Sequence, residues 1–282
     1  MQTSDPVAHH YGRGGHAIGG IAERILGALR EAKGADAPVT PEALAPIDHF
    51  HGRGVLATGE LVALLKMLPG EHLLDIGSGI GGPARWIAAK SGVHVTGVDL
   101  TPEFCAAARV LNDACGMTDR VMILEGSALD LPVPDAAFDR AYSQNVIMNI
   151  ADKAGFYREA LRALKPGGVL ALSNVCAGPG GEPYYPVPWA ATPETSFLAT
   201  PDDARRDIVA AGFEIVSFEN TTAAILPATL RHAERIEKDG LPPLGVHVIV
   251  GERIREMQIN SARGYREGRL ATIEVVARKP PR

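Results

Sequence analysis

A glycine-rich loop is the clearest chemical feature of this 282-residue sequence. It reads Asp75-Ile76-Gly77-Ser78-Gly79-Ile80-Gly81-Gly82 and separates a short apolar segment, His72–Ile76, from a helical pattern that begins at Pro83. Glycines at a strand-to-helix turn let the backbone approach a ligand closely at the helix N-terminus. Gly77, Gly79 and Gly82 also fit the G-x-G-x-x-G pattern of dinucleotide-binding proteins, which is a weak signal alone. The flanking residues must decide which ligand the loop holds.

Two carboxylates flank this loop. Asp75 stands two residues before the first glycine, where it would repel a pyrophosphate but suits a ligand that presents an ammonium group. Asp99 ends the second predicted strand, 22 residues beyond Gly77, where a carboxylate can accept hydrogen bonds from both ribose hydroxyls. The two acids together indicate a ligand with a ribose and an ammonium group and without a phosphate over the loop. S-adenosylmethionine fits that description.

Five segments carry a family resemblance. The segment 73–82 resembles the first motif of class I S-adenosylmethionine-dependent methyltransferases. Four further segments resemble the later motifs of this class, in the same order and at the family spacing: Val98-Asp99-Leu100, Gly126-Ser127-Ala128, Phe138-Asp139 and Leu164-Lys165-Pro166-Gly167-Gly168. The match covers roughly residues 70–220. Within the class, His51-Gly52-Arg53-Gly54 and Met148-Asn149-Ile150 are similar to the small-molecule group around the sarcosine/dimethylglycine, phosphoethanolamine and quinone methyltransferases.

The resemblance implies an α/β Rossmann-like fold, a seven-stranded and mostly parallel sheet whose last strand runs antiparallel, under a helical N-terminal lid. It also implies roles for the cofactor-binding residues. Gly77 and Gly79 would lie under the methionine part, Asp99 on the ribose, and Leu100 against the adenine. Ser127 and Ala128 would lie at the adenine edge, and Ser127 stands where the commonest pattern has Asp. A hydroxyl in that place would weaken the contact by about 1 kcal/mol.

Polar residues follow the fourth predicted strand, at the carboxyl edge where open α/β sheets bind ligands. Gln144 is a candidate contact for the methionine end of the cofactor, and Met148 for the substrate pocket. Asn149 stands where related enzymes often have His, so this position lacks an obvious base. We count Asn149 as a candidate catalytic residue; the alternative is that it caps the helix that begins near Asp152.

Two residues ahead of the core are candidates for the active site. His51 precedes Gly52-Arg53-Gly54, in the region that closes over the cofactor in related enzymes. We count His51 as a candidate catalytic residue and Arg53 as a candidate partner of the methionine carboxylate. An ordinary surface ion pair is the alternative for Arg53. No metal site is expected, because His49 and His51 lack a third ligand at a recognisable spacing.

Aromatic residues are few, at 5% of the chain, so each is a candidate for the substrate pocket. Tyr11 lies in the Gly-rich N-terminal arm and is counted with the candidate catalytic residues. Tyr184, Tyr185 and Trp189 lie in a Pro-rich loop after the fifth predicted strand. Aromatic rings around a sulfonium would attract it by about 0.5–2 kcal/mol. Covering the edge of the core is the alternative role, above all for Trp189.

Alternating short apolar segments and helical patterns position these residues. Strands are predicted at 72–76, 93–98, 121–124, 138–143, 169–175, 213–218 and 272–277, and helices at 21–34, 56–68, 83–90, 102–115, 153–164 and 202–211. The stretch 35–46 contains three prolines and is predicted to be a connector. Alternation of this kind predicts right-handed βαβ units and a parallel sheet covered on both faces.

We expect one compact unit, in which residues 1–69 form an arm and a helical lid. Residues 70–282 would form the core, with insertions at 178–198 and 223–270. The second insertion is expected to be helical. The substrate pocket would be built from the arm and these two insertions, which leaves the acceptor atom (nitrogen, carbon or oxygen) open.

Composition excludes several classes of protein. Apolar residues make up 46% of the chain and charged residues 22%, which is typical of a globular protein. The 28 Lys and Arg against 33 Asp and Glu give a net charge of −5, so a nucleic-acid partner is not expected. No apolar run is long enough to span a bilayer. Three cysteines are too few for a disulfide framework, and we expect a cytoplasmic enzyme, with a homodimer as an open alternative to a monomer.

Two other functions compete with a small-molecule methyltransferase. An NAD(P)-dependent oxidoreductase is disfavoured by Asp75 and by the lack of a Tyr-x-x-x-Lys pair, since Val146 and Leu161 stand four residues after Tyr142 and Tyr157. A protein that binds the cofactor without turnover is the second alternative. A macromolecular substrate is not expected, because an Asn/Asp-Pro-Pro-aromatic segment is absent after the fourth strand.

Overall fold

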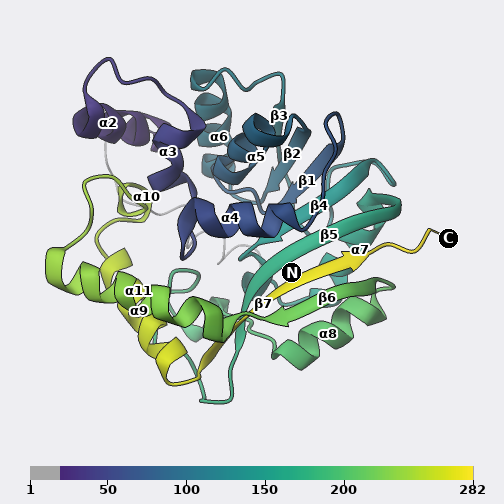
Figure 1. Ribbon diagram of the computed structural model, residues 1–282. Coiled ribbons are helices and arrows are strands. Elements are labelled where there is room, and N and C mark those ends of the chain that lie inside the picture. The colour runs from purple at the N-terminus through teal and green to yellow at the C-terminus, as the bar shows by residue number, and fades with distance from the viewer. Residues whose placement is uncertain (1–19, 282) are drawn as a thin grey trace.

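A seven-stranded sheet forms the centre of the computed structural model, which describes residues 20–281 (Figure 1). The strand order is β3-β2-β1-β4-β5-β7-β6. The strands are β1 His72–Ile76, β2 His94–Asp99, β3 Val121–Glu125, β4 Phe138–Gln144, β5 Leu164–Ala177, β6 Glu214–Asn220 and β7 Leu270–Arg278. The pairings within β3-β2-β1-β4-β5 are parallel, and β7 is antiparallel to both β5 and β6. This confirms the fold expected from the motifs.

Successive residues of β1 show how the sheet is covered on two faces. Leu73 packs in a cluster with residues of α4 Gly54–Ala63, α5 Gly82–Ser91 and α6 Pro102–Ala114. Leu74 packs in a different cluster, with residues of α7 Lys153–Ala163 and α8 Pro201–Ala210. Side chains alternate along a strand, so neighbouring leucines serve opposite faces. The sheet is therefore buried on both sides, as expected for a parallel sheet.

The segment before the sheet contains three helices: α2 Ile21–Lys33, α3 Pro41–Asp48 and α4. The prediction that 35–46 is a connector is therefore wrong. Pro41 occupies the first turn of α3, where a missing N–H costs nothing, and the Thr40 hydroxyl accepts from the amide of Ala43. Pro41 thus marks the start of a helix rather than an interruption between helices. The predicted helix 56–68 also begins and ends earlier, as α4.

A buried ion pair fastens α3 to the core. Arg85 Nη2 of α5 lies 2.8 Å from Asp48 Oδ1, and both side chains are almost fully buried. Gly82 allows this approach, because a Cβ at that position would lie 2.3 Å from the Cβ of Asp48. Removing either partner would leave a buried charge unpaired, so this contact fixes how α3 sits on the core.

Three further helices occupy the segment between β6 and β7: α9 Thr222–Asp239, α10 His247–Val250 and α11 Ile254–Arg266. Figure 1 shows α9 and α11 side by side below the sheet edge, and α10 next to α2. Ile249 of α10 packs in one cluster with Ile25 and Leu29 of α2. The helices before the sheet therefore meet those inserted before the last strand.

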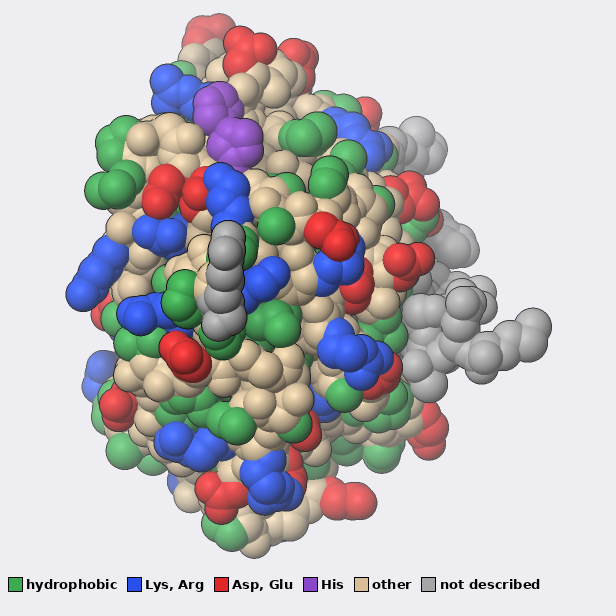
Figure 2. Space-filling model, turned by 90° about the vertical axis from the view of Figure 1, so that its right-hand side faces the viewer, with side chains coloured by type: hydrophobic (Ala, Val, Ile, Leu, Met, Phe, Trp, Pro, Cys, Tyr) green, Lys and Arg blue, Asp and Glu red, His purple; other side chains and the backbone are tan. Residues whose placement is uncertain are grey.

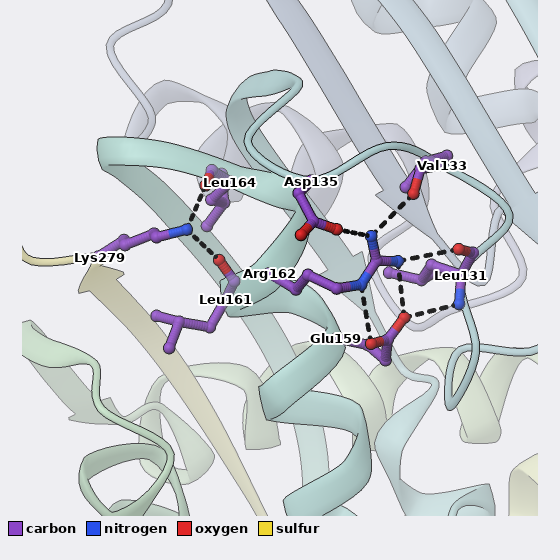
Figure 3. A network of polar contacts seen from close by, with 8 residues as sticks. All are labelled: Leu131, Val133, Asp135, Glu159, Leu161, Arg162, Leu164 and Lys279. Atoms are coloured by element: carbon purple, nitrogen blue, oxygen red, sulfur yellow. Dashed lines mark hydrogen bonds and ion pairs between the residues drawn. The ribbon is translucent and has the colours of Figure 1, made fainter.

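The opposite end of the sheet is held by a polar network around Arg162 of α7 (Figure 3). Its guanidinium donates to the carbonyls of Leu131 and Val133 and pairs with Glu159 and Asp135. The network ties α7 to the loop between β3 and β4. On the face in Figure 2, basic and acidic side chains are interspersed. Within residues 20–281, no helix combines the length and apolarity needed to cross a membrane.

Candidate functional site

A cavity of about 640 Å³ opens at the carboxyl ends of β1, β2, β4 and β5. The glycine loop lines it with Gly77 and Gly79, both at positive φ. Gly77 also allows close packing, since a Cβ there would lie 2.3 Å from a methyl carbon of Val146. The loop thus brings its backbone to the cavity at the start of α5, and the amides of Gly77 and Gly79 are already bonded to Val98 and Asp99.

Asp99 holds the glycine loop in place. Its Oδ2 accepts from the amide of Gly79 at 2.7 Å, and its Oδ1 accepts from the amide of Thr101 at 2.9 Å. Burial raises the pKa of Asp99, and these backbone bonds act in the opposite direction. The carboxylate lines the cavity and keeps lone pairs for further donors, as a ribose diol would require.

Asp75 is 1% exposed, and its Oδ2 has no hydrogen-bond partner. Burial, and secondarily the charge of Asp99, raise the pKa of Asp75 to about 8. An orphaned carboxylate oxygen on a cavity wall is costly unless a ligand pairs with it. An ammonium group would do so and would stabilise the ionised form. This feature fits S-adenosylmethionine, which carries the reactive methyl group on a sulfonium and an ammonium on its methionine part.

The residues predicted at the adenine end all line the cavity: Leu100, Ser127 and Ala128. Ser127 is partly occupied, because its Oγ accepts from the amide of Leu129 at 3.1 Å. Its hydroxyl hydrogen can still be donated to a ligand. These three side chains therefore share the cavity wall, and their contact with an adenine stays a prediction.

Thr58 of α4 is a polar centre that sequence reasoning missed. Its hydroxyl lies 2.8 Å from His49 Nδ1 and 3.1 Å from His51 Nε2, and it donates to Gln144 Oε1 at 3.2 Å. The hydroxyl of Tyr142 donates to the same Gln144 oxygen. Which partner donates in the two contacts with the imidazoles depends on the tautomer of each ring. The network fixes the orientation of Gln144 on the cavity wall.

His51 is a weak base because it is buried. Burial lowers its pKa to about 4, with the Gly52 carbonyl acting in the opposite direction and Arg53 in the same direction. Burial likewise lowers the pKa of His49 to about 3. Both rings are neutral at pH 7. His51 does line the cavity, and these values favour a hydrogen-bonding role over that of a general base.

Arg53 lines the cavity and forms an ion pair with Glu60, and its contact with the methionine carboxylate stays a prediction. Glu274 of β7 is a further lining residue, for which the sequence offers no signal. Burial raises the pKa of Glu274, and the charge of Glu60 adds to this effect while Arg53 opposes it. The three charges therefore form one local group at the edge of the cavity.

Asn149 lines the cavity and holds the loop that follows β5. Its Nδ2 donates to the carbonyls of Trp189 at 2.7 Å and Thr195 at 3.0 Å. The alternative that it caps α7 is wrong, because Asp152 is the N-cap and accepts from the amide of Gly155. An amide engaged in this way positions Met148, its cavity-lining neighbour, rather than acting as a base.

Lys153 reinforces this turn. Its Nζ donates to the carbonyls of Ile147 and Phe197, both at 2.6 Å, and to that of Ile150. Burial lowers the pKa of Lys153 to about 8. A buried ammonium that binds three carbonyls joins the turn after β4 to the chain beyond Trp189.

Of the aromatic residues predicted for the substrate pocket, some line the cavity and others do not. Trp189 lines the cavity and is 4% exposed, with its indole N–H donated to Ser196 at 3.0 Å. Tyr184 and Tyr185 are absent from the lining, so their assignment to the pocket is corrected. The Tyr184 ring lies under the guanidinium of Arg263 and its hydroxyl donates to Glu267, which binds it to the surface. Tyr11 lies outside the described residues.

The other end of the cavity is lined by the helices between β6 and β7, and we call this part the acceptor chamber. Its wall is mixed. Aliphatic side chains line part of it, from Ile225, Ala228, Val246, Val250 and Ile254, and polar or charged side chains line the rest, from Thr229, Arg231, His232, Arg235, Gln258, Ser261 and Tyr265. These helices contribute no carboxylate to the lining. Among the described residues, no group of three or more potential ligands could hold a metal ion.

Comparison with known proteins places this site in a family. Residues 74–172 match the family described as a methyltransferase domain. Residues 74–172 therefore form a methyltransferase domain. This match disfavours the oxidoreductase alternative. So does Asp75, because its negative charge would repel the pyrophosphate of a nicotinamide cofactor.

Individual relatives agree on the methyltransferase domain and differ in their acceptors. Phosphoethanolamine N-methyltransferase 1 of Arabidopsis thaliana is 30% identical over 208 residues, which are 68% of this chain and 40% of the relative. The 27-O-demethylrifamycin SV methyltransferase of Amycolatopsis mediterranei is 29% identical over 79% of this chain and 82% of the relative. Geranyl diphosphate C-methyltransferase of Streptomyces coelicolor shares the fold, with a TM-score of 0.71 at 18% identity over 99% of this chain and 98% of that chain. The chain spans less than half the length of its phosphoethanolamine relatives.

Proposed function

We propose that this chain transfers the methyl group of S-adenosylmethionine to a small molecule with a predominantly apolar body. The observation that carries the proposal is the division of the cavity between two kinds of wall. The cofactor end presents Asp75 and Asp99, whereas α9, α10 and α11 contribute no carboxylate to the acceptor chamber, and their lining combines aliphatic side chains with Arg231, His232 and Arg235. A hydrophilic amine would find no counter-charge on these helices, while a ring or a chain would be desolvated favourably.

Methyl transfer from a sulfonium is an in-line displacement, so the protein contributes mainly through positioning, by up to about 7–11 kcal/mol. Asp75 and Asp99 would bind the ammonium and the ribose, and the Thr58 network would hold Gln144 against the methionine end. Met148 and Trp189 would place the acceptor and exclude water. Transfer to a hydroxyl oxygen or a ring carbon forms the new bond to the methyl carbon, breaks the carbon–sulfur bond of the sulfonium and releases one proton from the acceptor, which would pass to water.

Calorimetry with S-adenosylhomocysteine tests the cofactor end. Replacing Asp99 by Ala should weaken binding by about 1–3 kcal/mol, because two hydroxyls lose their acceptor. Asp113→Ala, an exposed acid on α6, is the matched control and should leave the affinity unchanged. Equal affinities for Asp99→Ala and the wild type would contradict the ribose assignment.

Transfer of a labelled methyl group from S-adenosylmethionine tests the acceptor class and the alternative of binding without turnover. A panel of apolar alcohols and rings should be methylated faster than hydrophilic amines such as sarcosine. Preferential methylation of the amines would contradict the proposal. Binding of the cofactor without transfer to any member would favour the alternative.

Three broader expectations are part of the proposal. The division into a lid at 1–69 and a core at 70–282 with insertions at 178–198 and 223–270 is one of them. The cytoplasmic location and the alternative of a homodimer are the others. Sedimentation at micromolar concentration would distinguish a monomer from a dimer, and limited proteolysis would show whether the lid is released before the core.

A further inference from the structure

Two polar side chains of one helix lie next to each other among the residues that line the acceptor chamber. Gln258 and Ser261 both belong to α11 and both line the cavity. Residues three apart lie on the same side of a helix, so the two side chains are neighbours on the chamber wall. Ser261 is 8% exposed, which makes it one of the few buried polar residues of the chain.

Each of these side chains has a buried polar atom that lacks a hydrogen bond of normal geometry, although Gln258 also interacts with His232. The two atoms are Ser261 Oγ and Gln258 Oε1. Other hydroxyls of the same chamber are satisfied: Tyr265 pairs with Thr272 at 2.7 Å, and Thr229 donates to the carbonyl of Ile225 at 3.1 Å. Buried polar atoms without partners are rare and costly in folded proteins. Two of them on one cavity wall therefore point to a ligand that supplies the missing bonds.

The surroundings define the chemistry of that ligand. An amide oxygen only accepts hydrogen bonds, whereas a serine hydroxyl both donates and accepts. Burial, the larger cause, lowers the pKa of His232 of α9, whereas its contact with Gln258 acts in the opposite direction. Arg231 and Arg235 of the same helix also line the chamber. No carboxylate of α9, α10 or α11 lines the chamber to balance an ammonium. A hydroxyl group satisfies both atoms at once, because it can donate to Gln258 Oε1 and accept from Ser261.

We propose that Gln258 and Ser261 form a subsite that binds a hydroxyl group of the methyl acceptor. The proposal rests on the proposed function and narrows its acceptor class to apolar molecules that carry a hydroxyl. Ser261 and Gln258 are specificity-determining residues in this scheme. The hydroxyl is the group by which the acceptor is recognised, and the aliphatic side chains of the chamber bind the rest of the molecule.

Two probes of nearly equal shape test the subsite. We would titrate 2-naphthol and 2-methylnaphthalene into the protein saturated with S-adenosylhomocysteine at pH 7, and follow tryptophan fluorescence. The wild type should bind 2-naphthol on the order of 3- to 10-fold more tightly, which is the range of one or two neutral hydrogen bonds. Ser261→Ala should reduce this ratio towards one and leave the affinity for 2-methylnaphthalene unchanged.

Two further variants make the result specific. Gln258→Leu removes the accepting oxygen and should reduce the ratio in the same direction. Ser91→Ala is the matched control, because that hydroxyl donates to the carbonyl of Ile87 within α5, away from the chamber. It should preserve the wild-type ratio. Unchanged affinity for S-adenosylhomocysteine in each variant shows that the fold is intact.

The outcomes separate the subsite from the proposed function. A ratio near one in the wild type, or a ratio that Ser261→Ala leaves unchanged, overturns the subsite. So does tighter binding of 2-naphthoate than of 2-naphthol, because Arg231 and Arg235 also line the cavity and would then select an anion. Failure of both neutral probes to bind overturns the apolar chamber as well. Failure of S-adenosylhomocysteine to bind would instead overturn the proposed function.

Discussion

Cofactor binding should release a proton from Asp75. Burial, with a smaller contribution from Asp99, raises the pKa of this carboxyl to about 8, so about ten of eleven molecules carry the proton at pH 7. The ammonium of S-adenosylhomocysteine would pair with the ionised form and lower that pKa. Binding at pH 7 should therefore release about 0.9 proton for each ligand bound, which calorimetry in buffers of different ionisation enthalpy measures directly.

The sign of the pH dependence follows from the same shift. Below pH 8 the free protein must first lose the Asp75 proton, which costs about 1.4 kcal/mol for each pH unit. Protonation of Asp75 weakens the binding of S-adenosylhomocysteine by a factor of about 101 at pH 6 and about 2 at pH 8. The affinity should thus fall by about 50-fold from pH 8 to pH 6. Asp75→Asn should bind more weakly at pH 8 and should lose this pH dependence.

Asp75 should also make the cofactor-free protein less stable as the pH rises. A carboxyl whose folded-state pKa lies above its unfolded value stabilises the fold at low pH, and this contribution is lost between about pH 4 and pH 8. Asp75→Asn should therefore raise the unfolding free energy of the cofactor-free protein at pH 7 by as much as about 4 kcal/mol. Proton release near zero at pH 7, or the same release from Asp75→Asn, would refute the reasoning.

Three other substitutions test the elements around the site. His51→Ala should lower turnover more than it lowers cofactor affinity. The pKa of His51 is about 4, so the pH profile of the wild type should lack a histidine step near 6.5. His51→Gln, which can still form hydrogen bonds, should retain more activity than His51→Ala. Lys153→Met removes three carbonyl contacts and should speed amide hydrogen exchange around Trp189; unchanged exchange would contradict its role. Gly82→Ala should lower the unfolding free energy by several kcal/mol, about 3 or more, because the new Cβ meets α3, whereas Gly27→Ala should raise it by about 0.5–1 kcal/mol in thermal or urea unfolding.

The core of the fold follows from local signals. Short apolar segments that alternate with helical patterns marked the seven strands, and the family resemblance implied the antiparallel β7. These signals are local because each strand and the helix beside it are short, continuous stretches of sequence. The connector at 35–46 failed for a related reason: Pro41 begins a helix as readily as it ends one.

The cofactor end was more predictable than the rest of the site. Asp75, Asp99 and the glycines stand within 25 residues of one another on consecutive βα units, so their spacing implies their proximity. Thr58 could not be found in this way. It meets Gln144 across 86 residues of sequence, and nothing in the pattern of α4 says which polar residue faces the sheet. Ser261 and Gln258 were missed because unpaired atoms are a property of the packed structure.

The two ends of the cavity should therefore respond differently to substitution. The cofactor end is held by contacts that reach deep into the core: the ion pair of Asp48 with Arg85, and the bonds from Thr58 to Gln144. The acceptor chamber is built from helices that are linked to the sheet only through β6 and β7. Changes at Gln258 or Ser261 should therefore alter which acceptor binds and leave cofactor affinity intact. A change at Asp48 should weaken both, because α3 and α4 border the cofactor end and α10 packs against α2 and α3.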